Sequence, residues 1–353
     1  MTLLKKSSLI ALAIFILGTT QCAKERSVTV NSIRPADIEV PSNIKTLLIV
    51  DRTKFDRNVI DVLEGVLTGE LPYEDKASMQ FLTNAMRAEL THSPRFQIKL
   101  ATERLSGNSL TSAFPQVLAW DRIDSLCRKY NADAMIAVEI FDTDFIITNG
   151  TRKKKKKVTE GGVTKEIEVD EYYAQGVNNL KMGLRLYDPS SKQILDQKLL
   201  KERGTWDAAA TSKAGALLAL IDKADATHQL SSRIGADYAY RVSPMSVQIT
   251  RKFRGNSRKA PALARGSRLA DVGKWQEAID VWKSGIPNAR EKDQGYLAYN
   301  IAIAYEILGN MSEAKEWASD SYTLYGNKAG TLYLKLLNLR IQNEKIAEMQ
   351  LKD

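Results

Sequence analysis

The sequence predicts a two-domain α+β protein, with a mixed-sheet α/β layer domain followed by an all-α domain of helical repeats. Strand and helix patterns alternate along the first part of the chain, which is typical of an α/β layer. A region of strand patterns follows, and the remainder is helical and repeats itself. The chain has 353 residues, of which 44% are apolar and 26% charged, so it can form about two domains with a core each.

The predicted organisation has five parts along the chain. A signal peptide occupies residues 1–21, and residues 22–43 form a tether. The α/β domain follows over 44–250. A basic segment punctuated by Gly and Pro, residues 251–261, forms the linker to helical repeats and a capping helix over 262–353.

The first segment is typical of a secretory signal. Lys5 and Lys6 precede an apolar run over residues 8–17, which is too short to cross a bilayer as a helix. The position of Cys22 resembles the lipobox of bacterial lipoproteins, although residues 19–21 depart from the usual pattern. We therefore expect cleavage before Cys22 and acylation of its thiol. The alternatives are a plain secreted protein and an uncleaved anchor.

Charge and cysteine content limit the partners. The formal net charge is +9, and a protein outside the cytoplasm meets little nucleic acid, so we expect no nucleic-acid partner. If Cys22 is acylated, Cys127 has no cysteine left to pair with in the chain. No disulfide is therefore expected.

The α/β domain begins with a β-α-β-α-β series of patterns. Strands are predicted over 45–51, 95–101 and 133–142, and helices over 75–91 and 121–130. The apolar positions that predict the two helices recur every three or four residues; they are Met79, Leu82, Met86 and Leu90 in the first, and Ile123, Leu126, Cys127 and Tyr130 in the second.

Strand patterns then replace the helices. Residues 179–187 and 193–201 alternate around a strong turn sequence, Asp188-Pro189-Ser190-Ser191. A single long helix is predicted over 208–240, ended by Ser243-Pro244, and residues 247–251 predict a last strand. The face of that helix would carry Leu217, Leu220, Ile221, Ala224, Ile234 and Tyr238.

The basic run at residues 152–157 predicts one side of a hairpin over 152–171. Gly161-Gly162 forms its two-residue turn. Counting back from that turn places Lys157, Lys155 and Lys153 opposite Glu166, Glu168 and Asp170, so the lysines on one side are neutralised. The alternative is contact with anionic lipid or a partner.

The helical tail carries two copies of one motif, 36 residues apart. Gly273 begins the first copy and Gly309 the second. The motif resembles the tetratricopeptide repeat, with Gly ending one helix, Ala allowing close packing and aromatic residues filling gaps. An ordinary helical hairpin domain is the alternative. The predicted packing residues are Gly273, Trp275, Ala278, Trp282, Tyr305, Gly309, Ala314 and Trp317.

A capping helix is predicted after the repeats. It covers residues 328–343, with Leu332, Leu336 and Leu339 on its apolar side.

No catalytic, metal or cofactor site is predicted. His92 and His228 lack the spacing of metal ligands, and no nucleophile-elbow, dinucleotide or P-loop motif occurs. Cys127 lies on an apolar helix face, which favours packing over nucleophilic chemistry. Asp142 and Asp144, near a strand end, are interpreted as turn formers. We expect a protein that is not an enzyme.

The predicted order of strands and helices after an acylated cysteine resembles that of the curli-secretion lipoprotein. It is also similar to that of the amino-terminal domain of the Tol-system propeller protein. Four segments more closely resemble an uncharacterised Bacteroidota lipoprotein family with tetratricopeptide tails. They are residues 34–36, 48–53, 64–70 and 93–96. This resemblance implies a fold and a compartment, and no catalytic residue.

The expected function is that of a non-enzymatic scaffold or adaptor. The lipid would hold the chain at the outer membrane, facing the periplasm because residues 23–26 carry no acidic cluster, and the helical repeats would bind another envelope protein. The alternative is an oligomeric part of a secretion or transport assembly. A pore is disfavoured because the charged hairpin cannot face lipid over a membrane thickness.

Overall fold

The computed structural model describes residues 25–54, 72–107 and 113–352. Cys22 and the predicted signal peptide lie outside these residues, as does the segment 64–70. The chain divides into two compact units. The α/β unit comprises residues 35–245 and the residues from Ala347 onward, and the helical unit comprises β1 (Glu25–Arg34) and residues 246–346. The predicted combination of a mixed α/β domain and an all-helical region is confirmed.

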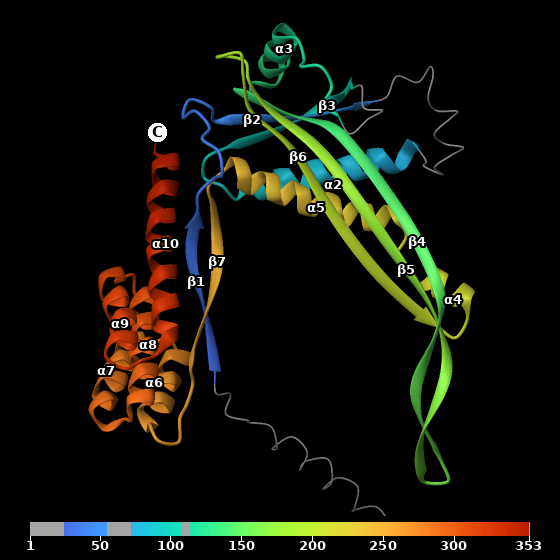
Figure 1. The fold of residues 1–353 in the computed structure, drawn as a ribbon. Coiled ribbons are helices and arrows are strands. Elements are labelled where there is room, and N and C mark those ends of the chain that lie inside the picture. Colours follow the sequence, from blue (N-terminus) through green and yellow to red (C-terminus); the bar gives the residue numbers. More distant parts are fainter. Residues whose placement is uncertain (1–24, 55–71, 108–112, 353) are drawn as a thin grey trace, which may run out of the picture. The chain divides into compact units, whose positions relative to one another are not determined.

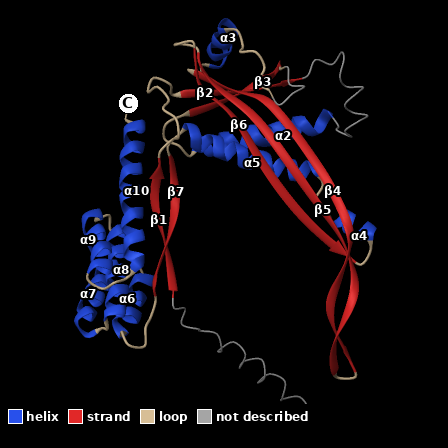
Figure 2. Cartoon of the chain, viewed as in Figure 1, coloured by secondary structure: helices blue, strands red, loops and turns tan. Residues whose placement is uncertain are grey.

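A five-stranded mixed sheet forms the centre of the α/β unit (Figures 1 and 2). Its strand order is β3-β2-β4-β5-β6. The pairs of β2 with β3 and with β4 are parallel, whereas β5 runs antiparallel to both β4 and β6. The strands are β2 (Thr46–Lys54), β3 (Gln97–Ser106), β4 (Ala134–Glu160), β5 (Val163–Asp188) and β6 (Gln193–Ala210).

Helices cover both faces of this sheet. α2 (Pro72–Thr91) and α5 (Lys223–Val242) pack on one face, and α3 (Trp120–Tyr130) packs on the other. The predicted apolar stripe of α2 is buried in the core, as are three of the four predicted residues of α3. A Cβ on Gly235 of α5 would lie 2.9 Å from the carbonyl oxygen of Leu82, so glycine allows α5 to approach α2 closely.

β4 and β5 form one long hairpin rather than a sheet strand followed by a separate charged hairpin. Their register places Lys153, Lys155 and Lys157 opposite Asp170, Glu168 and Glu166, which confirms the predicted pairing. Gly161 and Gly162 form the turn with positive φ angles of 57° and 83°. β6 pairs with β5 only between Tyr172 and Asp188, so residues 152–171 continue beyond the sheet as a two-stranded segment, the terminal ribbon.

The prediction of one helix over 208–240 is wrong. β6 continues to Ala210, and the rest of the segment divides into α4 (Lys213–Ala219) and α5. Ser212 accepts a hydrogen bond from the Gly215 amide at 3.1 Å, and Asp222 accepts one from the Asp225 amide at 2.7 Å. These two side chains are N-caps, which start separate helices.

The sequence of residues 28–30 also predicts a short strand within the tether, and this strand is longer than predicted; the linker prediction needs correction. β1 and β7 (Met245–Arg254) pair as a two-stranded sheet, so parts of 22–43 and of 251–261 are strand. Phe253 of β7 is buried in the helical core, within 6.0 Å of Trp275 and 6.2 Å of Trp282 between ring centres. The α/β unit is therefore an insertion between two strands of the helical unit.

The helical unit contains two helical hairpins and a final long helix. They are α6 (Pro261–Asp271) with α7 (Trp275–Gly285), the 3₁₀ turn η1 (Ile286–Asn288), α8 (Glu291–Ile307) with α9 (Met311–Thr323), and α10 (Lys328–Leu351), whose last residues from Ala347 group with the α/β unit. None of the described helices is both long and apolar enough to cross a membrane.

Candidate functional site

The predicted repeat residues lie at the helix junctions of the helical unit. Gly273 and Gly309 have φ angles of 77° and 80°, a conformation that glycine adopts at the end of a helix. Ala278 and Ala314 are fully buried where the helices pack. These positions lie where a repeat of helical hairpins requires them.

The aromatic residues of the motif contribute to the same core. Trp282 is fully buried and Tyr305 nearly so, while Trp275 and Trp317 are half-buried against the core. Lys283 joins the two hairpins, because its ammonium group donates to the Tyr305 hydroxyl at 2.8 Å and lies 5.3 Å from the centre of the Trp317 ring. The aromatic set therefore packs the unit internally.

α10 buries a different face from the one predicted. Tyr333 and Leu337 lie in the core, whereas Leu332, Leu336 and Leu339 are 66%, 46% and 53% exposed. We call these three side chains the leucine row. Successive members are four and three residues apart, so they lie along one side of the helix. The row is therefore an exposed apolar surface on one side of α10.

A buried charge cluster joins α10 to the rest of the helical unit. Glu306 of α8 is fully buried and accepts hydrogen bonds from Arg251 of β7, from Arg340 and from the Tyr333 hydroxyl. Burial alone would raise the pKa of Glu306, but these hydrogen bonds together hold that pKa below its ordinary value. Arg340 also donates to the Asn31 carbonyl of β1 at 3.0 Å.

The α/β unit contains a similar cluster around Glu139. This carboxylate is fully buried on the α3 face of the sheet, at a register shift between Val138 and Ile140. It accepts hydrogen bonds from Arg52 at 2.8 Å, from Arg185 at 2.7 Å and from the Tyr187 hydroxyl at 2.6 Å. Burial, followed by the hydrogen bond to Glu139, raises the pKa of Tyr187 to about 12.

Neither cluster was predicted from the sequence, although a pattern pointed to each carboxylate. Glu139 interrupts an apolar strand sequence, and Glu306 interrupts an apolar helix sequence. A charged residue inside such a run is rarely buried without a partner. The arginine partners come from distant parts of the chain and could not be identified from spacing.

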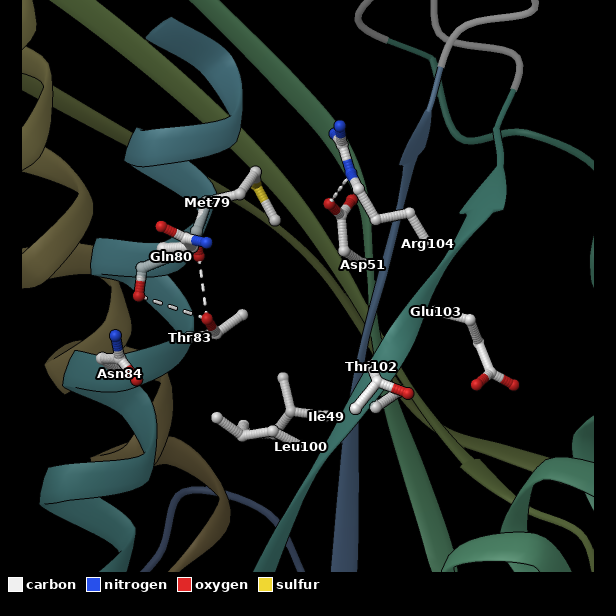
Figure 3. A pocket seen from close by; sticks show the side chains of 11 residues that line it. Ile49, Asp51, Met79, Gln80, Thr83, Asn84, Leu100, Thr102, Glu103 and Arg104 are labelled. Carbon is white, nitrogen blue, oxygen red and sulfur yellow. Dashed lines mark hydrogen bonds and ion pairs between the residues drawn. The ribbon is translucent and has the colours of Figure 1, made fainter. Parts of the chain in front are cut away.

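A cavity of about 660 Å³ lies between β2, β3 and α2 (Figure 3). Asp51 and Arg104 line it and pair with each other, and Arg104 also donates to Thr53 at 3.2 Å. Glu103 points away from α2 and accepts hydrogen bonds from Lys129 and the Tyr130 hydroxyl. The charged groups of this cavity are therefore committed to protein partners.

The residues considered for catalysis have packing or pairing roles, or are exposed. Burial, with nearby acidic groups, raises the pKa of the Cys127 thiol to about 12, which opposes nucleophilic chemistry. The His92 side chain is exposed, and His228 stacks on Phe81 with ring centres 4.0 Å apart. Asp142 pairs with Lys181 at 2.8 Å. Across the described ranges, no group of three His, Cys, Asp or Glu side chains could hold a metal ion.

Two family models match the chain. A domain of unknown function, DUF8603, matches residues 44–253, which is more than half of the 353 residues. A second domain of unknown function, DUF6340, matches residues 264–345. The two matches cover the α/β unit and the helical repeats. No curated protein sequence matches the chain.

Solved structures give only distant likenesses. One is the PelC dodecamer from Paraburkholderia phytofirmans, with 11% identity over 62% of this chain and 99% of that chain and a TM-score of 0.25. Another is a neuraminyllactose-binding hemagglutinin homologue from Helicobacter pylori, with 10% identity, coverage of 58% and 94% respectively, and a TM-score of 0.23. Neither is close enough to assign an activity.

Proposed function

Because this chain belongs to the family of the domain of unknown function DUF8603, whose description states no activity, we propose its function from its own geometry. It is a non-enzymatic scaffold of the bacterial cell envelope. A lipid on Cys22 holds it at the outer membrane, facing the periplasm, and the helical unit binds another envelope protein.

The leucine row of α10 carries this proposal. Burial of a fully exposed leucine side chain is worth roughly 1.5–3 kcal/mol, and these three are 66%, 46% and 53% exposed, so covering them can contribute about half of that free energy each. Leu332, Leu336 and Leu339 are too exposed to contribute much to the core of their own unit. A partner that covers them gains that free energy.

The spacing of the row specifies the kind of partner. Steps of four and three residues are the a and d positions of a heptad, and the same series continues to Asn343 and Ile346. Both of these side chains are only partly buried. We therefore assign the surface to an amphipathic helix of another protein, packed along α10.

Other features support the scaffold over an enzyme. Glu139 and Glu306 each form hydrogen bonds with buried side chains of their own cluster. Within the described ranges, neither carboxylate is directed into a cleft. The two helical hairpins with glycines of positive φ resemble tetratricopeptide repeats, which are built for protein contacts. An oligomeric secretion or transport component is the alternative, in which the partner helix would be α10 of a second copy.

Photo-crosslinking in the native membrane tests the proposal. A photoreactive amino acid at Leu336 should crosslink to a helix of one other envelope protein, identified by mass spectrometry. The triple change Leu332→Gln, Leu336→Gln and Leu339→Gln should abolish co-purification of that same protein. A matched control changes three exposed apolar residues elsewhere and should retain it: Leu218→Gln, Val272→Gln and Leu308→Gln.

Two results would count against this assignment. Crosslinks only between copies of the chain, together with a large species in light scattering, would support the oligomeric alternative. Equal partner retention by the row variant and the control variant would remove the row from the binding surface.

A further inference from the structure

The strand register of the terminal ribbon separates its charges by face. Residues directly opposite each other in an antiparallel pair project to the same side. Lys153, Lys155 and Lys157 therefore share one face with the acidic residues opposite them, and Lys153 forms an ion pair with Asp170 at 2.7 Å. The hydroxyls of Thr159 and Thr164 lie 3.1 Å apart on that same face. This neutral face carries three positive and three negative groups.

The opposite face holds the whole positive excess of the ribbon. We call it the basic face; its charged residues are Arg152, Lys154, Lys156, Lys165, Glu160 and Glu171. Glu171 pairs with both Arg152 at 2.7 Å and Lys154 at 2.6 Å. Within the part of the chain that the structure describes, Lys156 and Lys165 are in no ion pair. These two lysines lie opposite aliphatic residues, whereas every lysine of the neutral face lies opposite an acidic one, so Lys156 and Lys165 are available to a ligand.

Aliphatic side chains are confined to the same face. Ile167 lies opposite Lys156, Val169 opposite Lys154, Lys165 opposite Val158, and Val163 opposite Glu160. Ile167 is 44% exposed and Val163 58% exposed. The neutral face between residues 153 and 170 has no aliphatic residue at all. One side of the ribbon is thus both basic and apolar, and the other is neutral and polar.

We propose that the basic face of the terminal ribbon binds a membrane surface rich in anionic lipid. Each lysine near such a surface contributes about 1 kcal/mol of attraction. Lysine side chains can keep the ammonium group at the phosphates while neighbouring aliphatic groups enter the boundary of the acyl chains. The ribbon supplies both kinds of group side by side.

Lipid explains this surface better than an acidic protein does. An acidic protein segment would neutralise the lysines but would leave Ile167 and Val163 exposed beside charged groups. A lipid interface presents phosphate oxygens and apolar material next to each other. The ribbon is free of β6 along its length, so β6 does not cover its basic face. Contact through this face does not require acylation of Cys22.

Vesicle co-sedimentation tests the proposal with two variants of equal charge. The parent protein is the chain from residue 22 onward with Cys22→Ala, so that no acyl chain contributes. It is mixed with phosphatidylcholine vesicles that either contain or lack phosphatidylglycerol. The basic-face variant carries Lys154→Gln, Lys156→Gln and Lys165→Gln. The neutral-face variant carries Lys153→Gln, Lys155→Gln and Lys157→Gln. Both lose three positive charges, and circular dichroism verifies that both remain folded.

We expect binding only to vesicles with phosphatidylglycerol, weakened by salt. The basic-face variant should bind roughly thirtyfold or more weakly, since Lys156 and Lys165 each contribute about 1 kcal/mol near the surface and about 1.4 kcal/mol is tenfold in affinity. The neutral-face variant should bind like the parent. Equal weakening of both variants would mean that only net charge matters and would overturn the proposal. Absence of parent binding would overturn it too, as would capture of polyglutamate without capture of vesicles.

Discussion

Arg251 donates two hydrogen bonds of 2.8 Å each to the carboxylate of Glu306. The two residues lie 55 positions apart in the chain, Arg251 on β7 and Glu306 on α8. Both side chains are buried. Arg340 and Tyr333 add further hydrogen bonds from α10, so one carboxylate connects β7, α8 and α10. The helical unit depends on this single acidic group.

Glu306→Gln should therefore destabilise the protein strongly. The substitution leaves the buried Arg251 guanidinium without a carboxylate and leaves Arg340 with Glu344 alone. Removal of one partner from a buried ion pair costs about 3–5 kcal/mol. Urea unfolding followed by far-UV circular dichroism measures the loss. Glu316→Gln, at an exposed site on α9, is the control and should change little. A Glu306→Gln protein as stable as the control would contradict the cluster's role.

The same cluster predicts a pH dependence. The pKa of Glu306 lies below its ordinary value of 4.5, so the folded state favours the charged carboxylate. Its contribution to stability is complete above that ordinary value and is lost as the pH falls through the lower, folded-state pKa. The Glu306→Gln protein should lose less stability than the parent over this acidic range. Parallel pH profiles of the two proteins would contradict the linkage.

Ala314→Leu should overpack a helix crossing. Ala314 is fully buried in the core of the helical unit, where extra methylene groups cost about 1–3 kcal/mol. A lower melting temperature in calorimetry is the expected result. Ala329→Leu adds the same atoms at an exposed position of α10 and serves as the control. Identical melting temperatures for Ala314→Leu and the parent would show that this site has room.

Cys22→Ala should release the protein from the membrane fraction. Acyl chains supply most of the attachment of a lipoprotein, so the variant should appear in the soluble fraction after a high-salt wash. Immunoblotting of the two fractions measures this. Retention of the variant on the membrane after the wash would mean that Cys22 is not the principal anchor.

Cys127 should be unreactive while the protein is folded. Because burial raises the pKa of its thiol to about 12, little thiolate exists at neutral pH. An aromatic disulfide that releases a coloured thiolate on reaction with a free thiol should modify Cys127 of the Cys22→Ala protein only after urea is added. Rapid labelling without urea would place this thiol in an open environment.

Much of the α/β unit could be predicted from local patterns. Met79, Leu82, Met86 and Leu90 follow helical spacing, and all four are buried. The ribbon register followed from the position of Gly161-Gly162 alone, because a two-residue turn determines every later pair. Patterns of this kind are local, and local spacing suffices to predict them.

The errors arose where tertiary structure decided between two local choices. On α10, the exposed series Leu332, Leu336 and Leu339 is wholly apolar, whereas the side that the protein buries includes polar groups. The buried side instead carries Tyr333 and Arg340, which are placed by their bonds to Glu306. Tyr333, Leu337 and Arg340 also follow helical spacing, so periodicity allows either side of α10 to face the core, and the bonds to the distant Glu306 favour this one.

The insertion of the α/β unit between β1 and β7 has a mechanical consequence. Only two residues of the sequence separate Cys22 from the start of β1. Tension applied to a lipid at Cys22 would enter the helical unit first. From β1 it would pass to α10 through the bond of Arg340 to Asn31 and that of Ser32 to Glu344. Load between the membrane and a helix bound to α10 would thus bypass the α/β unit, which could unfold without breaking that connection.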